Sequence, residues 1–205
     1  MEMKKLFLCF FMFSSFVLMG QQNFEFSLNG GYTGRNSFAI NGGSALIENS
    51  QAFSGAISYF VQPEFSAELF YARQPTILSA FSSFDNLRIR EEGSVSYWMV
   101  GIRPEIPSTA ENVSFYMSFR LGGVTFSTRS DEFERSIKLA TSLGGGMRYH
   151  ITDNLGFQLT SNLFLPIFDA GSTLWFGTDG AGAGATSWCP ILQLNVNAGL
   201  FFQLN

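Results

Sequence analysis

Residues 192–204 have the sequence LQLNVNAGLFFQL, and every even-numbered position of this stretch is apolar. The odd-numbered positions carry Gln, Asn or Gly, with Phe201 as the single exception. A period of two places successive side chains on opposite faces of a β-strand. The stretch therefore predicts a strand with one face in an apolar environment and the other in a polar one.

The same alternation recurs through the chain. In the run 113–126 the odd-numbered residues from Val113 to Leu121 are apolar and predicted to face outward, and in 136–149 the larger apolar residues again have odd numbers. In the run 94–103 both parities carry bulky apolar residues, so its facing stays open between Val95/Tyr97/Met99 and Trp98/Val100/Ile102 as the outer set. Eight runs result, at about 24–33, 52–61, 65–73, 94–103, 113–126, 136–149, 155–165 and 192–204.

Composition decides what surrounds these strands. The chain of 205 residues is 46% hydrophobic with 24 Phe, yet only 14% charged, against roughly 25% in soluble domains. After the first twenty residues no apolar run approaches the ~20 residues that a membrane helix needs. A closed barrel is the remaining way to cross lipid, because it leaves no strand edge without hydrogen bonds. We therefore predict an all-β protein, an eight-stranded antiparallel up-and-down transmembrane β-barrel.

The connections support this topology because short and long ones alternate. The short ones, predicted to lie in the periplasm, are 62–64, 104–112 and 151–154. The others, which are mostly longer and are predicted to lie outside the cell, are 35–51, 74–93, 127–135 and 166–190. A strand-like extension above the membrane is possible in 74–93.

The first twenty residues have the pattern of a secretory signal peptide. Lys4 and Lys5 precede an apolar stretch that ends at Met19, and Gly20 supplies a small residue for cleavage. The predicted organisation is thus a signal peptide at 1–20 and a single outer-membrane barrel domain at 21–205. Cleavage leaves 15 acidic and 10 basic residues, a charge of about −5, which argues against nucleic acid as a partner. Only Cys189 remains, so no internal disulfide forms.

The C-terminal residues 197–204 are similar to the assembly signal of outer-membrane barrels, with Asn197, Gly199, Phe202 and Leu204 at its characteristic positions. Asn205 departs from the pattern, which usually ends on an aromatic residue. Residues 144–154 resemble the glycine-rich strand and short polar turn of small barrels of the Bacteroidetes. The mature chain as a whole resembles small outer-membrane barrels of the OmpX-like, OmpW-like and PorT-like group. The resemblance implies a bacterial outer-membrane location, a lipid surround and insertion by the barrel-assembly machinery, and leaves the activity open.

Charged residues predicted on the inner face suggest how the barrel is filled. An eight-stranded barrel is only wide enough for its own side chains or one small ligand. Ionised groups in so narrow a space must pair, because an isolated buried charge costs several kcal/mol. We expect a polar network in the lumen, either a static filling or a gate, formed by Glu25, Glu68, Arg120, Lys138 and Arg148.

Catalytic, metal and cofactor sites are not indicated. The only histidine, His150, falls at a predicted periplasmic turn, where a side chain is more often solvated than catalytic. No carboxylate cluster has metal-site spacing. The glycine-rich segment 177–186 lacks the flanking strand, helix and lysine of a phosphate-binding loop and is expected to be a flexible loop tip. Around it, Trp175, Phe176 and Trp188 are candidates for an external binding surface.

Three functions remain open from the sequence. The first is a non-enzymatic barrel that binds an extracellular ligand or envelope protein through external loops, or that supports the envelope. The second is a transporter of a small, apolar solute. The third is a soluble periplasmic barrel that binds a lipid, for which the Phe-rich rows would have to face a cavity instead of a bilayer.

Overall fold

The protein is described by a computed structural model in which the placed residues are 23–40, 43–82, 88–110, 112–128, 136–169, 173–177, 180–184, 188–190 and 192–204. The predicted signal peptide at 1–20 lies outside these residues and stays a prediction. The placed residues contain no helix that is long and apolar enough to span a membrane.

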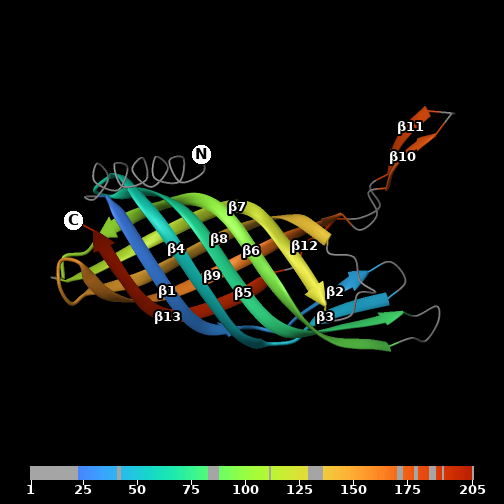
Figure 1. The fold of residues 1–205 in the computed structure, drawn as a ribbon, viewed down its shortest axis with the longest axis horizontal. Coiled ribbons are helices and arrows are strands. Elements are labelled where there is room, and N and C mark those ends of the chain that lie inside the picture. Colours follow the sequence, from blue (N-terminus) through green and yellow to red (C-terminus); the bar gives the residue numbers. More distant parts are fainter. Residues whose placement is uncertain are drawn as a thin grey trace, which may run out of the picture.

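Eight antiparallel strands close into a barrel (Figure 1). Neighbours pair in the order β5-β4-β1-β13-β9-β8-β7-β6, and β6 pairs back with β5. The first and last strands of the wall, β1 and β13, are therefore neighbours, so no edge of the wall is left open. The bounds of the eight are β1 Phe24–Thr33, β4 Ser50–Gln62, β5 Phe65–Ser82, β6 Arg88–Pro107, β7 Val113–Thr128, β8 Ser136–His150, β9 Leu155–Asp169 and β13 Gln193–Leu204.

The strand register fixes the tilt of the wall. Followed from Gly30 strand by strand, the pairing reaches β7 at Thr125 in one direction and at Phe115 in the other. The difference, 125 − 115 = 10 residues, is the stagger of the closed barrel. With about 3.3 Å per residue and about 4.8 Å between strands, this stagger tilts the eight strands roughly 40° from the barrel axis.

The apolar rows face outward. On β7, Met117 is 60% exposed while its neighbour Ser118 is 3% exposed, and β8 and β13 alternate in the same way. The structure also settles the facing of the fourth run, now β6, because Trp98 is 59% exposed and Tyr97 only 2%. The outer set is therefore Trp98, Val100 and Ile102. Because the apolar rows face outward and do not surround a cavity, a soluble lipid-binding barrel is not supported.

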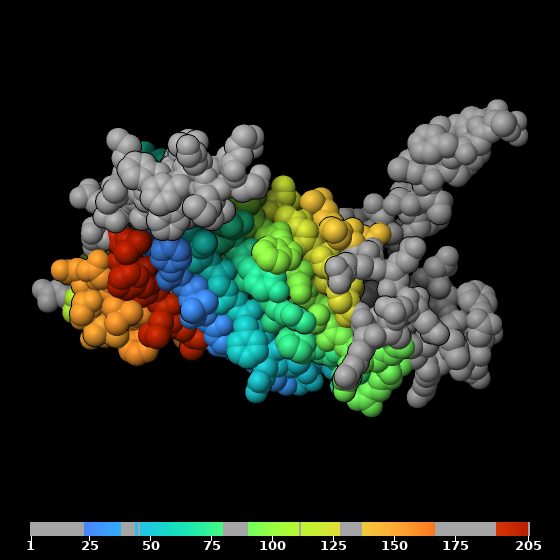
Figure 2. All heavy atoms as spheres, viewed as in Figure 1, coloured from blue at the N-terminus to red at the C-terminus, as the bar shows by residue number. Residues whose placement is uncertain are grey.

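Aromatic rings mark one end of this apolar surface. Phe24 and Tyr59 contact each other there with ring centroids 5.1 Å apart, and Phe65 begins β5 at the same end. The short turns lie at this end, which by the usual arrangement of bacterial barrels faces the periplasm. Figure 2 shows the wall over β13, β1, β4 and β5 as a continuous layer of side chains.

Two of the predicted external connections are largely strand, which corrects the sequence-based boundaries. In 74–93, β5 continues to Ser82 and β6 begins at Arg88, and the two strands pair over this length. In 35–51, strands β2 Asn36–Ile40 and β3 Gly43–Ile47 pair with each other, and β3 adds to β5. A four-stranded sheet thus extends beyond the extracellular end of the barrel, at the right of Figure 1. We call this part, formed by β2, β3, residues 74–82 of β5 and 88–93 of β6, the extension.

Other connections also differ from the prediction. Strand β6 continues through Pro107, inside the expected turn 104–112. In 166–190, β9 continues to Asp169 and pairs with β12 Trp188–Pro190. The glycine-rich segment is not a bare loop tip, since β10 Thr173–Gly177 and β11 Gly180–Gly184 pair in register. The composition of this segment did not indicate that it pairs with β10.

Candidate functional site: the filled lumen

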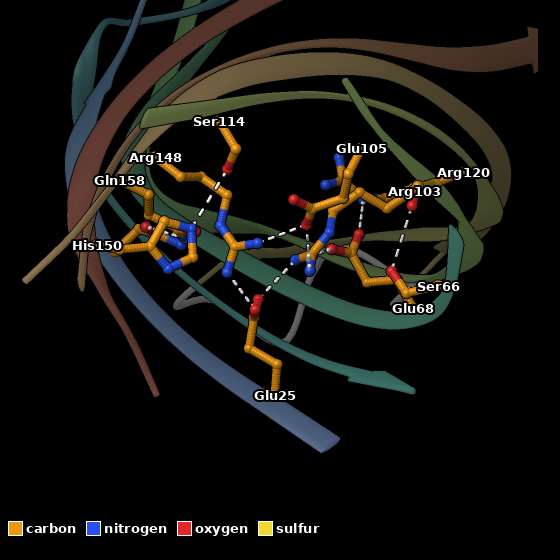
Figure 3. Close-up of polar contacts among 11 residues, drawn as sticks. Glu25, Ser66, Glu68, Arg103, Glu105, Ser114, Arg120, Arg148, His150 and Gln158 are labelled. Carbon is orange, nitrogen blue, oxygen red and sulfur yellow. Dashed lines mark hydrogen bonds and ion pairs between the residues drawn. The ribbon is translucent and has the colours of Figure 1, made fainter. Parts of the chain in front are cut away.

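A ring of ion pairs closes the periplasmic half of the lumen. Arg103 on β6 donates to Glu25 on β1 at 2.8 Å and to Glu105 at 3.2 Å. Arg148 on β8 donates to the same two carboxylates, Glu25 and Glu105. Figure 3 shows the four side chains meeting inside the barrel from three strands. Both guanidinium groups and the Glu25 carboxylate are no more than 1% exposed.

A second pair joins this ring. Arg120 on β7 donates to Glu68 on β5 and to the amide oxygen of Asn162, the latter at 2.8 Å. Glu68 in turn lies 3.8 Å from Arg103. The six residues therefore form one ionic cluster with three carboxylates and three guanidinium groups, and its formal charges cancel. Such balance offsets the cost of burying the ions. The members are Glu25, Glu68, Arg103, Glu105, Arg120 and Arg148.

Aromatic rings cover the guanidinium groups of the cluster. Arg148 lies over the ring of Phe201, 3.8 Å from its centroid, and Arg120 lies 4.2 Å from the centroid of Phe70. A cation over a ring face is attracted by the ring quadrupole. This contact explains why Phe201 interrupts the polar row of the last strand, because its ring is fully buried in the lumen against Arg148.

Glycines on the inner face make room for these large side chains. A Cβ at Gly144 would lie 2.5 Å from both Ser118 Oγ and Asn162 Oδ1, the partner of Arg120. A Cβ at Gly146 would lie 2.8 Å from the ring of Tyr116. The two inward-facing glycines of β8, Gly144 and Gly146, are therefore a consequence of close packing inside a narrow barrel.

The extracellular half of the lumen is filled in a different way. Tyr97 and Phe164 stack with centroids 4.2 Å apart and planes 14° apart, and Phe70 lies next to them. Ile47 of the extension is 2% exposed and belongs to the same cluster, so the base of the extension packs into the extracellular half of the lumen. We call this cluster the apolar tier; its buried members are Ile47, Ala56, Phe70, Ala72, Val95, Tyr97, Met99, Val124, Ala140 and Phe164.

Amide and hydroxyl side chains connect the two halves. Gln158 donates to Asn29 at 2.7 Å, and Asn195 donates to Thr33 at 2.9 Å. Between the ionic cluster and the apolar tier these groups leave an enclosed space of about 10 Å³. A space of this size holds about one water molecule, so this part of the lumen has no room for a solute.

Four of the five predicted network residues come together here, namely Glu25, Glu68, Arg120 and Arg148. Lys138 does not join them. It precedes Arg148 by ten residues on β8, which is roughly 33 Å along a strand, and it lies half-buried toward the other end of the lumen. The sequence showed that Lys138 faces inward but gave no depth for it.

Sequence reasoning missed Arg103 and Glu105. Both belong to β6, the strand whose facing stayed open. They share the parity of Val95, Tyr97 and Met99, so deciding the outer set of that strand would have identified them. Their charge was the available signal, because an ionised residue in a membrane strand is expected to face inward or lie at an interface.

The remaining predicted site residues lie elsewhere. His150 ends β8 at the periplasmic side, where its Nε2 lies 3.4 Å from Ser114 Oγ and its ring meets the edge of Phe201. Among the placed residues, no three His, Cys, Asp or Glu side chains gather as a metal site. Trp175, Phe176 and Trp188 lie in β10 and β12, but their side chains are outside the described part of the structure.

The C-terminal residues of the predicted assembly signal occupy both faces of β13. Asn197 is buried and donates to Ser54 at 3.4 Å, and Gly199 pairs with Asn29 and Gln158. Phe202 is exposed on the outer face, with Leu204 two residues further along the same row. Recognition of this segment by the insertion machinery stays a prediction.

A closed barrel of eight tilted strands, with an apolar outer belt and a filled lumen, defines a small outer-membrane β-barrel. Comparison with solved structures agrees. Neisserial surface protein A is 12% identical, with 87% of this chain and 96% of that chain covered and a TM-score of 0.55. Outer membrane protein AlkL, solved in DMPC lipid bilayers, is 14% identical, with 89% and 92% covered and a TM-score of 0.54.

These likenesses show a shared fold, which hosts different activities. No protein-family model matches the chain, and no curated protein matches it in sequence. The closed barrel and its apolar outer belt place this protein in the bacterial outer membrane. Its particular task has to be inferred from its own residues.

Proposed function

We propose that the chain is a non-enzymatic outer-membrane barrel whose body is closed and whose extracellular surface binds a partner. The observation that carries the proposal is the filling of the lumen by the ionic cluster below and the apolar tier above. With the space between them reduced to about 10 Å³, the barrel body serves as a rigid support. A binding role then falls to the parts outside the membrane.

The extension supplies a surface for such a partner. Among the described strands, its outermost strand β2 pairs on one side only, with β3. Arg90 is 65% exposed and pairs with Glu48 at 3.1 Å, and Glu91 and Glu92 follow it. A mixed-charge sheet outside the membrane favours a protein or glycan partner over a buried solute. The external-loop residues Trp175, Phe176 and Trp188 remain candidates for aromatic anchors on the extracellular side.

Transport of a small apolar solute is the second candidate, and the apolar tier at the extracellular end is the observation that favours it. A transported solute would have to displace Tyr97 and Phe164 and then pass the ionic cluster. Displacing buried rings and ions costs several kcal/mol at each step. We therefore place this function second to surface binding.

Photo-crosslinking in intact cells tests the binding proposal. A photoreactive amino acid is placed at Trp175 or at Arg90, and the matched control carries it at the outward-facing Phe157. We expect discrete protein or glycan adducts from the two extracellular positions and lipid adducts alone from Phe157. If the extracellular positions yield no adduct under conditions where Phe157 labels lipid, the surface-binding proposal is wrong.

Targeting and assembly are part of the proposal. A leader at 1–20 is expected to be removed on export, which N-terminal sequencing of the purified protein checks. Phe202→Ser is expected to slow insertion into the outer membrane, because the apolar face of the last strand is then interrupted. A normal insertion rate in pulse-chase labelling would remove Phe202 from the predicted assembly signal.

A further inference from the structure

One charge stands on the lipid-facing wall. Arg73 on β5 is exposed and shares its face with Leu69 and Tyr71. It is the only charged side chain on the outer face among the described wall segments, which are 24–33, 50–62, 65–75, 94–107, 113–127, 137–150, 155–166 and 193–204. A charge facing lipid is costly unless it reaches an interface.

The depth of Arg73 identifies that interface. It follows Phe65, at the periplasmic aromatic end, by eight residues. At about 3.3 Å per residue and a tilt near 40°, this separation is roughly 20 Å along the barrel axis. The apolar band of such barrels is about 25 Å tall. A guanidinium group at this depth extends along its own methylene chain to the outer boundary.

Two aromatic residues lie on the periplasmic side of Arg73, on the same outer face of the wall. Tyr71, two residues before Arg73, packs against Trp98 with centroids 4.2 Å apart, and Trp98 is more than half exposed. Rings of this kind favour the level of the lipid headgroups. Ser96 pairs with Arg73 across the strands, and Gln51 is exposed on β4 nearby. The position therefore combines an apolar shelf with hydrogen-bond donors above it.

Within the part of the chain that the structure describes, Arg73 has no counter-charge. Among the described residues, none of the carboxylates forms an ion pair with it; Glu48, in the extension, pairs with Arg90. The three carboxylates of the ionic cluster lie inside the lumen, behind the wall. The described residues therefore leave Arg73 open to an anion at the level of the outer lipid headgroups.

We propose that Arg73, with Ser96 and Gln51 beside it, binds the phosphate of an anionic lipid in the outer leaflet. The forked donors of a guanidinium group match the oxygens of a phosphate. The Tyr71 and Trp98 rings would contact the sugar or the first carbons of the same lipid. This exposed apolar shelf favours a lipid phosphate over phosphate free in solution, because free phosphate gains nothing from the two rings.

Native mass spectrometry of the full chain in detergent micelles tests the site. The probes are a phosphorylated glucosamine-based glycolipid, its dephosphorylated form and inorganic phosphate. We expect Arg73→Gln to weaken binding of the phosphorylated lipid about fivefold, the size expected for one arginine at a charged lipid surface. The control Arg90→Gln, on the neighbouring strand in the extension, should bind like the wild type. The dephosphorylated lipid should bind all three forms equally.

Two results would overturn the proposal. One is equal binding of the phosphorylated lipid by wild type and Arg73→Gln. The other is displacement of that lipid by millimolar inorganic phosphate, which would identify a site for a soluble anion instead. If Arg73→Gln does not fold, the salt dependence of wild-type binding decides. Weaker binding on going from about 0.1 M to about 1 M salt supports the site, since screening acts on exposed charges, and salt-independent binding contradicts it.

Discussion

The two halves of the lumen are filled by opposite kinds of chemistry. In the periplasmic half, three carboxylates and three guanidinium groups are buried almost completely and held by one another. In the extracellular half, aromatic and aliphatic side chains pack together, and a chain of hydrogen bonds runs from the Tyr97 hydroxyl to Gln193 and on to Gln74. Both arrangements leave little room for water in the lumen. The first fills it with paired charges, and the second fills it with closely packed side chains. A narrow barrel can therefore be closed by either device, and this chain uses one above the other.

This difference predicts how each half responds to substitution. The stability of the ionic cluster should depend mainly on the balance of its buried charges. The stability of the apolar tier should depend mainly on its packing volume. Substitutions in each half, at their boundary and outside both fillings test this difference.

Glu25→Ala should have the largest effect. Glu25 accepts from both Arg103 and Arg148, so its loss leaves two buried guanidinium groups with fewer partners. Breaking a buried pair from one side costs about 4 kcal/mol of unfolding free energy. Urea unfolding of the barrel in lipid vesicles measures the change. Stability equal to the wild type would mean that the cluster is not held together by its charges.

Phe164→Ala tests the apolar tier in the same assay. It removes the ring that stacks on Tyr97 and leaves a cavity in a packed cluster, which we expect to cost about 3 kcal/mol. Phe164→Leu, which keeps more of the volume, should recover part of the loss. Should Phe164→Leu be as unstable as Phe164→Ala, packing volume would not be what stabilises this half.

Phe201→Leu examines the boundary between the two kinds of chemistry. The substitution keeps an apolar group but removes the ring face under Arg148. A buried cation and ring pair contributes about 1 to 2 kcal/mol, so the expected loss is of that size. Vesicle unfolding compared with Phe157→Leu on the outer face separates loss of the cation contact from loss of a ring in general.

Lys138→Ala is expected to change the unfolding free energy least, by less than about 0.5 kcal/mol. It lies outside the ionic cluster, ten residues along β8 from Arg148. A loss as large as that of Glu25→Ala would show that the cluster reaches much further up the barrel than its ion pairs indicate.

The same contrast explains which features the sequence revealed. Strands β7, β8 and β13 were assigned with their facing because a polar lumen opposite lipid produces clean alternation. Alternation disappears on β6, where the apolar tier places Val95, Tyr97 and Met99 inside. Arg103 and Glu105 were missed for that reason. Four network residues could be predicted from parity alone, whereas the depth of Lys138 depends on stagger between strands, which no single strand reveals.

The sequence left a strand-like extension open in 74–93, where β5 and β6 do pair, but it gave no sign of β2 and β3, for a different reason. Outside the membrane there is no lipid to enforce an apolar row, so residues 74–82 and 88–93 lack the pattern that marks the wall. Their strands form because β3 and the paired lengths of β5 and β6 satisfy one another's backbone groups. Such pairing depends on residues distant in sequence and cannot be deduced from local composition.

The central claim is that the ionic cluster and the apolar tier together close the lumen, and ion conductance tests it most directly. Wild-type protein is reconstituted into planar lipid bilayers, with insertion verified by protease protection of the same preparation. We predict no resolved current steps at moderate voltage, because the enclosed space between the two fillings holds about one water molecule. Stable, voltage-independent current steps from the wild-type barrel would contradict the account.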